Sequence, residues 1–117
     1  MPDSLEERLE AEIRTIEKRF RSLLREWAEA RPLAARWTFS GRALRWHVAL
    51  EDVLEPDVDI EVAPPVYVVR ARGRSDTRYV SVLPVPSQFD AGRPRIRAER
   101  DYLEIVVQRR RSRGPRR

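Results

Sequence analysis

Cysteine is absent from the 117 residues, and this absence removes several kinds of chemistry at once. Without a thiol the chain can form no disulfide, no iron–sulfur cluster, no cysteine-ligated zinc site and no thiol nucleophile. Long apolar runs are also missing, since no stretch approaches the ~20 residues of a membrane-spanning helix. The acidic start, Met1 to Glu7, lacks the apolar segment of a secretory signal. We therefore expect a soluble cytoplasmic protein that does not contact the membrane.

Catalytic and cofactor-binding motifs are scarce as well. His47 is the one histidine, and we interpret it as a residue on the polar face of a strand, because it has no second ligand of its kind. Neither a Gly-x-Ser-x-Gly motif, nor a P-loop, nor a Gly-x-Gly-x-x-Gly motif occurs. Asp52, Asp57 and Asp59 are close in sequence, as the paired acids of hydrolases can be, but solvated strand and loop faces explain them. We expect no enzyme activity, no metal and no cofactor.

Positive charge is abundant and collects at the end of the chain. Lysine and arginine number 24 against 19 acids, and Lys18 is the one lysine. Residues 109–117 contain no apolar residue, so we expect a disordered tail. Its arginines could neutralise phosphates in a salt-sensitive way, although few aromatic residues accompany the chain's arginines to stack on bases. Nucleic acid is thus a possible partner that is not favoured. The candidate polyanion contacts are Arg109, Arg110, Arg111, Arg113, Arg116 and Arg117.

The segment from Ser4 to Arg31 has the pattern of one long helix. Ser4 followed by Glu7 is a capping box, and Pro32 disfavours helical geometry at the residue before it. Apolar residues recur every 3.5 positions, which is the repeat of a coiled-coil seam. The residues of this stripe are Leu9, Ile13, Ile16, Phe20, Leu23 and Trp27.

Two interpretations of this apolar stripe remain open. It could pack on the helix's own domain, or it could pair with another copy of the chain or with another protein. The stripe covers fewer than three heptads, which is short for an autonomous coiled coil. If it pairs with a copy, a small homo-oligomer follows.

Beyond residue 41 apolar and polar residues alternate with a period of two, which is typical of strands with one buried face. In the first run Leu44, Trp46, Val48 and Leu50 share one side. Further runs are expected at 57–62, 66–71, 78–83, 95–98 and 102–107, and Pro64-Pro65 must form a turn because proline cannot donate to a sheet. The predicted organisation is a helix over 1–32, a connector over 33–41, a sandwich over 42–108 and a tail over 109–117.

The order of these runs resembles the α-crystallin domain of small heat-shock proteins (the Hsp20 family) and the related p23/CS domain. The resemblance rests on an acidic–apolar strand at 57–62, a Val82-Leu83-Pro84 strand ending, the Ile96-Arg97-Ala98 strand and the Leu103-Glu104-Ile105 closing strand. It covers about residues 42–108. It implies an all-β, immunoglobulin-like antiparallel sandwich preceded by the long amphipathic helix. It also implies ATP-independent binding of unfolding client proteins, as in a stress-response chaperone.

The departures from that family bear on function. Only residues 74–77 stand where bacterial and plant members carry a long strand-exchanging loop, and the tail lacks the family's Ile-x-Ile/Val anchor. The alternatives are therefore a CS-like adaptor that recruits one protein complex, or a basic nucleic-acid-associated protein. The groove expected to bind a client or partner lies between the strands at 58–62 and 95–98, where an extended segment could add as a strand. Its residues are Val58, Ile60, Val62, Ile96 and Ala98.

Overall fold

The computed structural model describes residues 4–25, 30–50, 57–73 and 76–110, and its first element is the helix α1 (Leu5–Arg25). The predicted capping box is confirmed. The Glu7 amide donates to Ser4 Oγ and the Ser4 amide donates to Glu7 Oε1, each at 3.0 Å. These bonds satisfy amides that have no partner inside the helix. The bond from the Ser4 amide, followed by that from its hydroxyl, lowers the pKa of the Glu7 carboxyl.

The described strands form two four-stranded sheets. Sheet A has the order β1-β6-β5-β4 and sheet B the order β2-β3-β8-β7. All neighbours are antiparallel except β1 and β6, which are parallel. The strands are β1 (Arg31–Pro32), β2 (Ala35–Ser40), β3 (Ala43–Ala49), β4 (Asp57–Ala63), β5 (Val66–Arg72), β6 (Arg78–Pro84), β7 (Arg95–Ala98) and β8 (Tyr102–Gln108).

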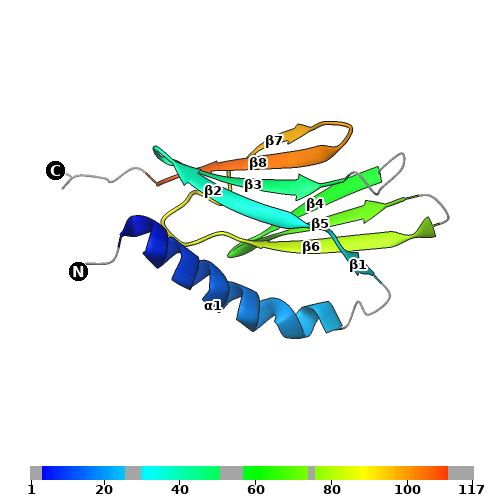
Figure 1. Cartoon of the computed structure of the whole chain (residues 1–117), viewed down its shortest axis with the longest axis horizontal. Coiled ribbons are helices and arrows are strands. Elements are labelled where there is room, and N and C mark those ends of the chain that lie inside the picture. Colours follow the sequence, from blue (N-terminus) through cyan, green and yellow to red (C-terminus); the bar gives the residue numbers. More distant parts are fainter. Residues whose placement is uncertain (1–3, 26–29, 51–56, 74–75, 111–117) are drawn as a thin grey trace.

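The sheets stack as two layers, and α1 forms a third layer beside β6 and β1 (Figure 1). The alternating runs explain the stacking, because each strand of a two-layer sandwich turns one side toward the other sheet. In β3 the residues at 44, 46 and 48 are buried while Arg45 is exposed. β5 is buried on both sides over its first four residues, as its continuous apolar run predicts. The prediction of a mainly β sandwich that follows one helix is thus confirmed.

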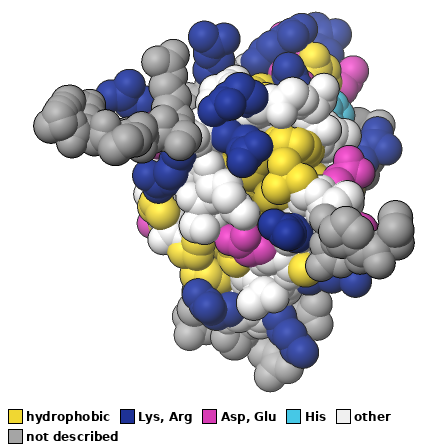
Figure 2. Space-filling view, turned by 90° about the vertical axis from the view of Figure 1, so that its left-hand side faces the viewer, with side chains coloured by type: hydrophobic (Ala, Val, Ile, Leu, Met, Phe, Trp, Pro, Cys, Tyr) yellow, Lys and Arg dark blue, Asp and Glu magenta, His cyan; other side chains and the backbone are white. Residues whose placement is uncertain are grey.

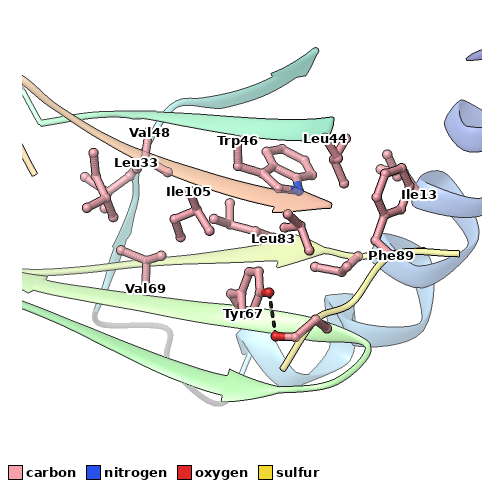
Figure 3. Close-up of a cluster of buried hydrophobic side chains, with 14 of the residues drawn as sticks. Ile13, Leu33, Leu44, Trp46, Val48, Tyr67, Val69, Leu83, Phe89 and Ile105 are labelled. Carbon is pink, nitrogen blue, oxygen red and sulfur yellow. Dashed lines mark hydrogen bonds between the residues drawn. The ribbon is translucent and has the colours of Figure 1, made fainter. Parts of the chain in front are cut away.

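The core between the sheets is apolar and continuous (Figure 3). Trp46, Val48 and Ile105 of sheet B face Tyr67 and Val69 of sheet A. Phe89, from the loop after β6, closes one end of the core and meets Phe39 edge to face, with ring centroids 5.9 Å apart. Burying a large apolar side chain stabilises the fold by about 1.5–3 kcal/mol, so these residues supply much of its stability.

Three buried polar side chains find backbone acceptors inside the sandwich. Trp46 Nε1 donates to the Pro84 carbonyl at 2.8 Å, and Ser81 Oγ donates to the Leu33 carbonyl at 3.1 Å. Tyr67 Oη donates to the Ala91 carbonyl at 2.6 Å, which is the dashed line in Figure 3. Burial, and to a smaller extent the nearby Asp90 carboxylate, raises the pKa of Tyr67 to about 12. The three bonds anchor the loop after β6 and the link between β1 and β2 to the core.

The helix packs on its own sandwich over the first part of its apolar stripe. Leu9 and Ile13 are buried within the main core cluster, and Figure 3 shows Ile13 beside Phe89. One turn further, Ile16 is buried in a second cluster on the outer face of sheet A, which is formed with Val66, Val68 and Val80. A polar contact accompanies these apolar ones, since Glu12 Oε2 accepts from the Ser87 amide at 3.0 Å.

The boundaries between helix, connector and sandwich differ from those expected. α1 ends at Arg25, and Arg31 and Pro32 pair with β6 as β1 instead of ending the helix. Pro32 is tolerated there because β1 is an edge strand. The expected connector at 33–41 contains β2, which pairs with β3 along six residues. The sandwich therefore begins at residue 31 and not at 42, since strand pairing with distant partners outweighs the local pattern.

Candidate functional site

The strands β4 and β7 form one open side of the sandwich. Each is the last strand of its sheet, β4 in sheet A and β7 in sheet B. At the opposite ends of the sheets, β1 and β2 are joined by Leu33 and Ala34 alone, so these two strands must lie on the same side. It follows that β4 and β7 share the other side. We call this side the β4/β7 edge.

Every residue expected in the groove faces the inside of the sandwich at this edge. Val58, Ile60 and Val62 lie opposite Ala71, Val69 and Tyr67 of β5, which are core residues. In the other sheet Ile96 and Ala98 lie opposite the buried Ile105 and Leu103 of β8. Residues that are directly opposite in an antiparallel pair share a face. The structure thus brings the five residues to one side, although the sequence places the two strands more than thirty positions apart.

The apolar residues of the β4/β7 edge are incompletely covered. Val58 and Ile60 are half-buried against the core, whereas Val62 is 43% exposed and Ile96 is 48% exposed. Within the described part of the chain these two are the large apolar residues classed as exposed. Among the described strands β4 pairs with β5 alone and β7 with β8 alone, so on the other side of each strand no described strand pairs with its backbone groups. Apolar side chains beside unpaired backbone amides and carbonyls are what strand addition requires.

Charged side chains line the outer sides of the same two strands with opposite signs. On β4 these are Asp59 and Glu61, and Arg70 of β5 approaches them at 3.8 and 2.8 Å. On β7 they are arginines, and Arg97 bonds Glu99 at 3.1 Å. That hydrogen bond is the main cause of the raised pKa of Arg97. Charges at an edge strand oppose uncontrolled pairing between sheets.

The connection between β5 and β6 is short, as the sequence indicates. β5 and β6 pair directly from Val66 to Arg72, and the Gly73 amide donates to the Thr77 carbonyl at 2.9 Å. Residues 74 and 75 lie outside the described residues. A connection of five residues, 73–77, leaves no length for a strand that could cross to another copy.

The structure describes the side chains of four of the six residues in the predicted helix interface. Leu9, Ile13 and Ile16 are buried on the sandwich of the same chain, so for them the structure shows the first of the two open interpretations. Phe20 is half-buried and packs on the second cluster. The Leu23 side chain and Trp27 lie outside the described residues. The same 3.5-residue repeat serves either interpretation, which is why the sequence could not decide between them.

Of the six arginines expected in a disordered tail, the first two are part of the fold. The Arg109 amide donates to the Arg42 carbonyl at 2.8 Å, and Arg110 Nε donates to the Ser87 carbonyl at 3.0 Å. Arg111, Arg113, Arg116 and Arg117 lie outside the described residues. Pairing with neighbouring backbone thus continues two residues beyond the end of β8 at Gln108.

His47 lies on the outer face of sheet B, as its position in the alternating run predicts. Its ring stacks on Tyr102, with centroids 4.6 Å apart and an interplanar angle of 20°. Sequence analysis missed this partner, because the pairing of β3 with β8 is needed to bring the two rings together. Asp52 lies outside the described residues. Within the described ranges no group of three histidine, cysteine or acidic side chains is placed to hold a metal ion.

Comparisons with protein-family models and with curated proteins both give no match to this chain. The helix of the described residues is too polar to cross a membrane.

Proposed function

We propose that this protein binds extended segments of other proteins at the β4/β7 edge without using ATP, as a holdase of the small heat-shock type. One observation carries the proposal. The edge strands β4 and β7 lie on the same side of the sandwich, and their inward apolar residues stay partly exposed. A client segment would add its backbone to β4 or β7 and place alternate side chains against Val62 and Ile96. The immunoglobulin-like, Hsp20-type assignment of the sandwich is part of this proposal.

A dedicated CS-like adaptor is the second candidate. The short 73–77 connection favours it, because it provides no strand for exchange between copies. Leu9, Ile13 and Ile16 are buried on the sandwich of their own chain, so half of the apolar stripe is not available for contacts with another copy. Homo-oligomerisation through the helix stays a prediction that concerns Phe20 and the residues after it. Both considerations point to a monomer or a small oligomer in light scattering.

The test measures whether the protein suppresses the heat-induced aggregation of three unrelated client proteins without nucleotide. Light scattering monitors the aggregation. We expect protection at near-stoichiometric ratios by the wild type and its loss in the double variant Val62→Ser, Ile96→Ser. Both side chains are about half exposed, so the variant keeps its fold, which circular dichroism verifies. The matched control is Val82→Ser, which removes a half-buried valine from the outer face of sheet A.

The outcomes separate the two candidates. Protection of all three clients that depends on Val62 and Ile96 supports the holdase. No protection of any client by the wild type contradicts the holdase and leaves the adaptor as the better explanation. An equal loss of protection in Val82→Ser would show that binding does not occur at the β4/β7 edge.

A further inference from the structure

The two outer faces of the sandwich are unlike each other. The outer face of sheet A carries valines that α1 covers through Ile16 and Phe20. The outer face of sheet B is covered by no element that the structure describes, since α1 contacts β6 of sheet A (Figure 1).

The strand register of sheet B shows which residues lie on its outer face. Leu44, Trp46 and Val48 of β3 point inward, so Arg45 and His47 point outward. Residues opposite them on the flanking strands share their side. One row across the sheet is Thr38, Arg45, Val106 and Arg95, and the next row is Arg36, His47, Glu104 and Arg97.

The face is basic at both borders, and its two central strands carry Val106 and His47 beside the ion pair of Arg45 and Glu104. Each row ends in an arginine of β7, and the second row also begins with Arg36 of β2. Figure 2 shows Lys and Arg side chains gathered along the top of the molecule, on the side of sheet B. Glu104 is the one acid within the two rows, and its closest cation is Arg45 at the long distance of 3.8 Å. Arg36 and Arg95 form no ion pair within the described residues, so their charge is available to a ligand.

We propose that the outer face of sheet B binds an acidic, extended peptide segment of a partner protein, at a site separate from the β4/β7 edge. The border strands β2, with Arg36, and β7, with Arg95 and Arg97, are three strands apart, which is about 14 Å at the usual strand spacing. In an extended peptide, residues i and i+4 lie about 13 Å apart on the same side. Two acids at that spacing would meet the two arginine borders, and an apolar residue between them would rest on Val106 of the central strand β8.

The geometry favours a peptide over single-stranded nucleic acid. Nucleic-acid platforms offer aromatic faces on which successive bases stack. Here His47 and Tyr102 stack on each other, so each ring has one face occupied within the protein. Glu104 also stands in the centre of the face, where a continuous line of phosphates would pass. Arginines at the borders instead suit separate carboxylates, which they bind in a bidentate manner.

The experiment measures binding of the fluorescein-labelled peptide Glu-Ser-Leu-Ser-Glu by anisotropy at low salt, with the full chain. Wild type is expected to bind, and the analogue with lysine in place of both glutamates is expected not to. The double variant Arg36→Gln, Arg95→Gln should lose at least tenfold in affinity. The matched control is Arg31→Gln, Arg78→Gln, which removes the same charge from exposed positions of sheet A and should change affinity by less than twofold.

His47 provides a second readout, which reports on the outer face of sheet B directly. Because it is the one histidine, its ring signals in NMR report on this face without ambiguity. The peptide should shift those signals in the wild type and in the sheet A control, and leave them unshifted in Arg36→Gln, Arg95→Gln.

Four results would overturn the proposal. The first is no peptide binding at millimolar concentration, and the second is an equal loss in both double variants. The third is a loss confined to a variant in which Arg111, Arg113, Arg116 and Arg117 are glutamine, which would assign binding to the end of the chain. The fourth is tighter binding of decauridylate, together with displacement of the peptide, which would make the face a nucleic-acid surface.

Discussion

The burial of Ile13 predicts that shortening this one side chain destabilises the whole domain. Ile13 is 2% exposed and lies in the same core cluster as Leu44 and Phe89. Isoleucine-to-alanine changes at buried sites cost about 2–5 kcal/mol, from lost transfer free energy and from the cavity that remains. Alanine has the higher helix propensity, so the helix itself gains slightly. We therefore expect Ile13→Ala to lower the free energy of unfolding by about 3 kcal/mol, or roughly 10 °C in Tm for a domain of this size.

The assay is thermal and urea unfolding followed by circular dichroism, with light scattering on the same samples. Arg14→Ala is the control from the next position of the helix. Its ion pair with Glu10 spans 3.2 Å between side chains that are 74% and 55% exposed, and such pairs contribute about 0.5 kcal/mol or less. An unchanged Tm for Ile13→Ala, combined with a smaller particle in light scattering, would refute the reasoning. It would mean that the stripe joins copies of the chain and does not dock on the sandwich.

Three further predictions concern single hydrogen bonds. The folded pKa of Tyr67 lies above its unfolded value near 10, so the neutral phenol stabilises the fold, and this stabilisation is lost as the pH rises from 10 to about 12. In urea unfolding, the free energy of unfolding of Tyr67→Phe should therefore depend less on pH over that range. An identical pH dependence in the variant and the wild type would contradict the assignment. Trp46→Phe leaves the Pro84 carbonyl without its donor, so chemical denaturation should show a loss of about 1–3 kcal/mol. Ser4→Ala removes the cap of α1 and should cost about 1 kcal/mol, with fraying seen as lower helical ellipticity and with Tm as the check.

Local patterns were enough to predict most of the elements. Alternation located β3 to β8, and the Ser4–Glu7 pair located the start of α1, because a strand face and a helix cap are each encoded within a few residues. The five residues of the β4/β7 edge were also predicted, since a sandwich of this type has few free strands.

Features that depend on distant residues were not predictable in the same way. β1 consists of Arg31 and Pro32, which have no strand pattern of their own and pair because β6 offers a free side. The stacking of His47 on Tyr102 depends on the β3–β8 register. The target of the helix stripe was equally undetermined, because period alone does not say which surface an apolar face meets.

The contact between α1 and the loop after β6 sets an order of events during synthesis. Glu12 and Ser87 are 75 positions apart, so at 5–20 residues per second roughly 4–15 s pass between the appearance of one and that of the other. During this interval the nascent helix exists without the surface that buries Leu9 and Ile13. A newly made chain thus exposes the apolar face of its first helix, which the finished protein hides, until the loop after β6 has been synthesised.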